Sequence, residues 1–158
     1  LIGAGAFFGC SSLQRISLPE GVTKINAFLF TRCQQLKIVN FTGNVTEIED
    51  YAFMECHFMS KINLPKYITY IGTQTFFRCA YLKSIVIPEF VTLIDNLAFG
   101  SCERLKSVTY LGEKPPLFSS DSFEETKIVK VYVKKGYQGS SFCNYSIEFL
   151  PDTFQDDL

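Results

Sequence analysis

Apolar residues recur along this chain at one constant interval. The first five cysteines are equally spaced without insertion or deletion, and seven apolar columns stay in phase with them. The cysteine column is Cys10, Cys33, Cys56, Cys79 and Cys102, and the column three residues before it is Phe7, Phe30, Phe53, Phe76 and Phe99. Such a period, twenty-three residues from one cysteine to the next, predicts a solenoid, because one unit cannot bury its own apolar face and several units must stack to do so.

Each unit begins with a predicted strand. In the segment 82–87, Leu82 is followed by Ile85 and Ile87, whose alternation is typical of a strand with one buried face. Pro88 ends this strand because proline cannot donate a hydrogen bond to a sheet.

The rest of the unit predicts two shorter elements. Val91 and Ile94, three residues apart, indicate a short extended return strand. Ala98, Phe99 and Cys102 follow the spacing i, i+1 and i+4, which favours a single inward-facing helical turn. We therefore expect an α/β repeat with a parallel sheet face, short return strands and short helical turns.

The repeat sets the expected organisation of the chain. Residues 1–133 hold six repeats, of which the first is truncated and the sixth is degenerate, with Glu125 at the cysteine position and the phenylalanine column slipped to Phe123. Residues 134–158 read as a C-terminal cap and tail, with 151–158 frayed. The chain starts in mid-repeat without a polar cap, which favours a piece of a longer protein.

The unit L-x-x-I-x-L-P-x-x-V-T-x-I-x-x-x-A-F-x-x-C resembles the leucine-rich repeats of BspA-like proteins. The resemblance covers residues 2–133, with Met59 as a mild departure in the leucine column, and 115–149 resembles the last repeat and cap of such proteins. It implies a right-handed, gently curved solenoid, found outside the cell or on the cell surface of bacteria or parasitic protists. Some relatives are adhesins, and the family offers no catalytic motif to transfer.

Composition and net charge limit the classes of partner that the sequence predicts. Hydrophobic residues make up 47% and charged residues 20%, and the net charge is −1. This balance predicts a folded protein without a general attraction to nucleic acid or acidic lipid. No apolar run approaches the roughly 20 residues that span a bilayer, so we expect no direct membrane insertion.

The residues capable of chemistry favour no catalytic, cofactor or metal site. The cysteines lack the C-x₂-C spacing of zinc sites, so a buried column of free thiols is preferred to redox or metal chemistry, with Cys143 the most exposed. His57 stands in a variable, polar column typical of a surface turn, and the pairs Glu49-Asp50 and Glu124-Glu125 imply no cleft. The glycines of 3–9 miss the dinucleotide-binding spacing. We expect a protein that is not an enzyme.

One surface is a candidate for binding. The six strand windows contain no Asp or Glu, and each contains at least one Lys or Arg, which predicts a cationic stripe along the sheet. The predicted face comprises Arg15, Ser17, Lys37, Asn40, Lys61, Asn63, Lys83, Val86, Lys106, Thr109 and Lys130. We expect it to bind a protein or an anionic glycan. Two alternatives stay open: lysines that only keep the sheet soluble and block strand addition, and a spacer without a ligand.

Overall fold

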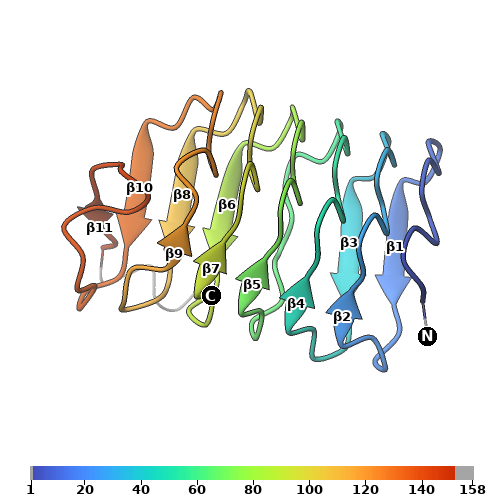
Figure 1. The fold of residues 1–158 in the computed structure, drawn as a ribbon, viewed down its shortest axis with the longest axis horizontal. Helices are drawn as coiled ribbons and strands as arrows, with labels where there is room; N and C mark the ends of the chain where they lie inside the picture. The colour runs from blue at the N-terminus through green and yellow to red at the C-terminus, as the bar shows by residue number, and fades with distance from the viewer. Residues whose placement is uncertain (1, 152–158) are drawn as a thin grey trace.

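The computed structural model describes residues 2–151, which form a single row of stacked coils (Figure 1). Residue 1 and residues 152–158, including most of the predicted frayed tail, lie outside the described part. Two parallel sheets run along the row on opposite sides, and the inward side chains of each coil meet between them (Figure 1).

The first sheet contains the predicted longer strands. They are β1 (Arg15–Leu18), β3 (Ile38–Phe41), β6 (Ser84–Ile87), β8 (Ser107–Tyr110) and β10 (Lys130–Val133), followed by the short β11 (Glu148–Phe149). The longer strands that pair do so in parallel with a register of one repeat, as in Ser84↔Ser107↔Lys130, whereas β11 pairs with β10 at an offset of 16 residues. The apolar columns therefore point inward and the polar columns between them point outward.

The prediction of six consecutive strands is wrong in the third repeat. Residues 60–64 form no strand, so the first sheet divides into β1-β3 and β11-β10-β8-β6. The inward column persists through this gap, since Ile62 is still buried. A coil can thus keep its inward side chains without forming strand hydrogen bonds. The second sheet and the stacking of Phe53 on Phe30 and Phe76 hold this coil in place.

The second sheet contains the predicted return strands. They are β2 (Lys24–Ile25), β4 (Glu47–Ile48), β5 (Tyr70–Ile71), β7 (Leu93–Ile94) and β9 (Leu117–Phe118). Their order follows the sequence without a break, so this sheet continues past the third repeat where the first sheet is interrupted.

The predicted helical turns are wrong, because the residues that the structure describes contain no helix. In the second repeat Phe28 and Arg32 both have positive φ, near 60°, which an α-helix of L-residues does not accommodate. Gly5 and Gly9 hold the same two positions in the first repeat. Every second amide in this segment donates to the next coil rather than to the carbonyl four residues back, so these segments form a third ladder between coils.

The phenylalanine column is the centre of the core. Phe7, Phe30, Phe53, Phe76, Phe99 and Phe123 stack face to face, with ring centroids 5.0–5.4 Å apart. The rings from Phe30 to Phe99 are completely buried. Each coil therefore gains its main apolar contacts from the coils on either side.

The sixth repeat is offset by one residue in its middle. Leu93 pairs with Leu117 and Phe99 stacks on Phe123, which in both cases is one residue more than the repeat period. In the strand that comes later, Tyr110 pairs with Val133 at the repeat period itself. Thr126, not Glu125, therefore holds the cysteine position, and its amide donates to Phe123 as that of Cys102 does to Phe99. Relative to the repeat period, the sixth repeat has one extra residue before β9 and one fewer between Phe123 and β10. The two changes cancel, so the register of β10 with β8 does not reveal the shift.

The segment 134–150 covers the last repeat only in part. β11 extends the first sheet beside β10, and no strand of the described chain extends the second sheet beyond β9. Phe142 and Tyr145 meet the ring of Phe123 edge-on, with centroids 6.2 and 6.1 Å away.

A glycine between coils gives a sharp test of this packing. A Cβ at Gly72 would lie 2.5 Å from Asp50 Oδ1 and 2.7 Å from Asp50 N, and Oδ1 is held by the amide of Thr73 and the hydroxyl of Tyr70. We expect Gly72→Ala to lower the free energy of unfolding by about 2–3 kcal/mol through overpacking. Chemical denaturation measures this, with Gly21→Ala as the control because no atom lies within 4 Å of its added Cβ. Equal effects of the two substitutions would contradict the close approach of the coils.

Candidate functional site

The predicted binding face lies on the outer side of the first sheet. Arg15 and Lys130 occupy the first strand position, and Lys61 stands at the equivalent place in the third repeat. Lys37, Lys83 and Lys106 come one residue earlier, just before their strands. All six side chains are exposed, so the bases form a ragged double column along the solenoid.

The polar part of the face is less uniform. Ser17, Asn40 and Asn63 are exposed, and the Asn40 amide donates to Ser17 Oγ at 3.1 Å. Val86 is partly buried, and Thr109 is only 8% exposed, between Val86 and Tyr132 in the strand register. Thr109 therefore contributes little to the accessible face, which is most polar in its N-terminal half.

Most bases on this face have no acidic neighbour. Among the described residues, the one ion pair that involves the face joins Lys130 to Glu148, with Nζ 3.5 Å from Oε2. Tyr132 and Glu148 raise the pKa of Lys130 by hydrogen bonding and by charge. Arg15, Lys37, Lys61, Lys83 and Lys106 form no ion pair within residues 2–151, so their charges remain available to a partner.

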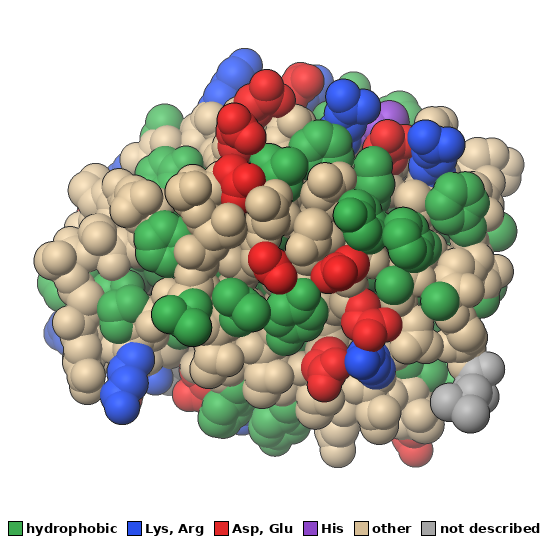
Figure 2. Space-filling model, in the orientation of Figure 1, with side chains coloured by type: hydrophobic (Ala, Val, Ile, Leu, Met, Phe, Trp, Pro, Cys, Tyr) green, Lys and Arg blue, Asp and Glu red, His purple; other side chains and the backbone are tan. Residues whose placement is uncertain are grey.

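Acidic residues gather on the opposite side. Figure 2 shows the side of the second sheet, where the charged side chains near the centre of the view are mostly acidic. Lys24 lies 2.8 Å from both Glu47 and Glu49, and its hydrogen bond lowers the pKa of Glu49. The Tyr70 hydroxyl lies 3.0 Å from Asp50 Oδ1 and 3.2 Å from Asp95 Oδ2, and burial raises its pKa. The nearly neutral chain thus separates its charges between two faces.

The cysteine column is structural. Cys33, Cys56, Cys79 and Cys102 are buried free thiols, which confirms the predicted column, whereas Cys10 is exposed. Each buried thiol donates to the carbonyl of the phenylalanine 26 residues earlier, with Sγ–O distances of 3.0–3.3 Å. The prediction for Cys143 is wrong: it is 8% exposed, and burial raises its pKa to about 12.

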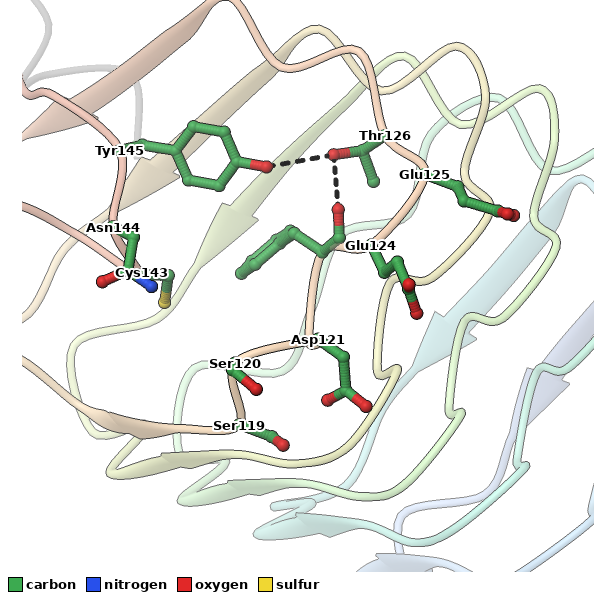
Figure 3. Close-up of a pocket in the computed structure, with 10 residues that line it drawn as sticks. Ser119, Ser120, Asp121, Glu124, Glu125, Thr126, Cys143, Asn144 and Tyr145 are labelled. Carbon is green, nitrogen blue, oxygen red and sulfur yellow. Dashed lines mark hydrogen bonds between the residues drawn. The ribbon is translucent and has the colours of Figure 1, made fainter.

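A pocket at the C-terminal end was not expected from the sequence. It has a volume of about 480 Å³ and lies between the turns of the sixth repeat and residues 143–145 of the cap (Figure 3). Its lining includes three acidic residues, Asp121, Glu124 and Glu125. The Glu125 carboxylate accepts a hydrogen bond from Ser101 Oγ at 2.7 Å. The view that Glu124-Glu125 lies away from any cleft is therefore wrong. In the sequence, the shift of the phenylalanine column to Phe123 could have indicated this pocket. A coil that is out of phase with the repeat does not stack evenly on the cap that follows it.

The structure also locates His57, for which we expected no catalytic role, and the side chains of the types that bind metal ions. His57 is half-buried and comes directly after Cys56 in the turn between coils. In residues 2–151 no group of three or more His, Cys, Asp or Glu side chains is placed to hold a metal ion. No helix in that range could cross a membrane.

Comparison with known proteins gives a consistent family. The model of the BspA-type leucine-rich-repeat region matches residues 1–130 in six copies. None of the curated proteins compared with the chain matches it.

Three solved structures are similar to the chain. A leucine-rich-repeat protein of T. pallidum is 26% identical over 74% of this chain, with a TM-score of 0.63, and one from Bacteroides ovatus is 25% identical over 96%, with a TM-score of 0.71. A leucine-rich cell surface protein from Faecalibacterium prausnitzii, 19% identical over 98% of the chain, shares the fold with a TM-score of 0.52. The chain spans 65%, 41% and 64% of these proteins, respectively.

Proposed function

The chain belongs to the BspA-type leucine-rich-repeat family, and from that premise we propose that it is a non-catalytic interaction module whose first sheet binds an acidic protein surface or an anionic glycan. Repeat proteins of this architecture present long, regular surfaces to partners. We also propose that the module acts outside the cell or at the cell surface; its membership of this family supports that proposal.

One observation carries this proposal. Five bases, Arg15, Lys37, Lys61, Lys83 and Lys106, are exposed on one side of the solenoid and are not neutralised by ion pairs within the described residues. Elsewhere in the described chain Lys24, Arg32 and Arg78 lie within 4 Å of a carboxylate, whereas Lys66 and Lys127 form no ion pair but stand apart from this row. A row of unneutralised charges raises the local concentration of an oppositely charged ligand and speeds its association.

The experiment reverses the charge at the centre of the face. We expect Lys61→Glu combined with Lys83→Glu to weaken binding to heparin, a sulfated glycan, at least ten-fold, which corresponds to about 1.4 kcal/mol. Affinity is measured by calorimetry at two salt concentrations, since screening should weaken the wild-type interaction.

The matched control makes the same change in net charge elsewhere. Lys66 and Lys127 are exposed outside the face, and Lys66→Glu with Lys127→Glu should leave most of the affinity intact. Equal losses in both double variants would point to non-specific attraction. If the wild-type protein binds neither heparin nor acidic proteins, the spacer function is favoured instead.

A further inference from the structure

The turn segments form a ladder that runs in one direction along the solenoid. In the second repeat the amides of Phe28, Phe30 and Arg32 donate to carbonyls of the third repeat at 2.8–3.1 Å. Further along, the amides of Phe99 and Ser101 donate to Ser122 and Glu124 of the sixth repeat, both at 2.8 Å. Alternate amides of these segments thus donate to the next coil, except that of Leu97, for which residues 2–151 offer no acceptor.

The ladder ends at the sixth repeat with donors unpaired. The counterparts of the three donors are the amides of Asp121, Phe123 and Glu125, which have no acceptor within residues 2–151. The alternate amides of this coil, Ser122 and Glu124, are occupied in turns with Ser119 and Asp121. Three backbone donors, spaced two residues apart, are left at the C-terminal end of the ladder.

The cap does not supply the missing acceptors. Phe142 and Tyr145 cover the ring of Phe123, and the Tyr145 hydroxyl lies 3.3 Å from Thr126 Oγ1. Between these contacts and Ser119–Asp121 the pocket of about 480 Å³ remains, and all three donor residues line it (Figure 3). A backbone amide that faces a pocket without a protein acceptor can donate to a ligand in place of water, so the pocket favours a ligand that brings carbonyl oxygens.

The charge of the pocket selects among such ligands. Asp121, Glu124 and Glu125 line it, and no Lys or Arg does. One oxygen of Asp121, Oδ1, is buried without a hydrogen-bond partner in the described chain. A free anion would satisfy the amides but would be repelled by the carboxylates, whereas a simple cation would pair with the carboxylates and leave the amides unused.

We infer that this pocket binds an extended peptide segment rich in Lys or Arg, which continues the ladder beyond the sixth repeat. An extended strand presents carbonyl oxygens on one side at every second residue. The unpaired amides belong to a turn and likewise come from every second residue, so the two agree in their alternation along the chain. Its basic side chains pair with the carboxylates. The site is separate from the sheet face and does not depend on it.

The test uses the whole chain and a defined probe. The acetylated, amidated peptide (Lys-Thr)₄ is titrated into isotopically labelled protein, and backbone amide resonances are followed by NMR. Binding should move the amide protons of Asp121, Phe123 and Glu125 downfield, as hydrogen bonding does, with little change at Phe30 or Ala52. The matched peptide (Glu-Thr)₄ should bind at least ten-fold more weakly.

Variants separate the contributions of charge and backbone. Glu124→Gln with Glu125→Gln should weaken (Lys-Thr)₄ binding about ten-fold, and Asp121→Pro should weaken it more than Asp121→Asn because only proline removes the amide. Since proline also restricts the backbone of the turn, spermine serves as a second measurement, because it carries positive charge without carbonyls. If spermine binds as tightly as the peptide, or the three amides do not move, the inference is overturned.

The outcome is independent of the sheet face. The Lys61→Glu, Lys83→Glu protein should keep the full affinity for (Lys-Thr)₄. Absence of (Lys-Thr)₄ binding by the wild-type chain at millimolar concentration would also refute the pocket, and would leave the heparin result untouched.

Discussion

Replacing Phe76 with alanine is expected to lower the free energy of unfolding by about 3–5 kcal/mol, as is usual for a buried aromatic ring. Phe76 is completely buried and stacks on Phe53 and Phe99, with centroids 5.3 and 5.2 Å away. The substitution therefore leaves a cavity in the middle of the solenoid, which the ladders on both sides prevent from collapsing. Urea denaturation followed by circular dichroism measures the loss.

A phenylalanine outside this column serves as the control. Phe58 is 40% exposed and contacts Tyr81 at the surface, so Phe58→Ala should cost about 1 kcal/mol or less. Because each coil contacts only its neighbours, Phe76→Ala should also broaden the unfolding transition by uncoupling the two halves. A Phe76→Ala protein as stable as the Phe58→Ala protein would refute the central role of the phenylalanine stack.

The second large effect is a loss of stability at alkaline pH. Burial raises the pKa of Cys33 to about 11 and those of Cys102 and Cys143 to about 12, and raises the pKa values of Cys56 and Cys79 as well. In the unfolded chain these thiols ionise near pH 8.5. Above that pH the folded state binds more protons than the unfolded state, so stability falls as pH rises.

The expected magnitude comes from this linkage. At pH 9.5 each buried thiol should cost about 1.4 kcal/mol relative to pH 7.5, and the five together several kcal/mol. Thermal unfolding at both pH values tests this while unfolded tyrosines, whose pKa is about 10, remain mostly protonated. The free energy of unfolding keeps the full contribution of the buried thiols below about pH 8 and loses it progressively as the pH rises toward 11.

Cysteine variants assign the effect to the column. Cys56→Ala with Cys79→Ala should reduce the pH dependence by about two-fifths, because two of the five buried thiols are removed. A thiol reagent should modify one cysteine rapidly in the native protein and all six after unfolding. Rapid modification of several native cysteines would contradict the burial on which the pH effect depends.

The candidate sites were predictable to different degrees. The bases of the sheet face could be placed from the repeat, because alternation along a strand fixes which side chains point outward. Thr109 was misplaced because its exposure depends on its neighbours Val86 and Tyr132. Cys143 was misplaced for a similar reason: it lies outside the repeat, so only the fold of the cap shows that it is buried.

The sequence by itself determined the repeat unit, the parallel sheet face, the short return strands and the inward columns. These follow from side-chain periodicity, which any stacked arrangement of equal units must satisfy. Only the tertiary structure decided the features that depend on backbone hydrogen bonds between coils. The spacing of Ala98, Phe99 and Cys102 fits a helical turn, yet the left-handed Leu97 and Ser101 exclude one. The pocket arises at the sixth repeat, where the ladder ends with the amides of Asp121, Phe123 and Glu125 unpaired in the described chain. Apolar spacing records which side chains are buried, whereas the partner of each amide depends on the coil beside it.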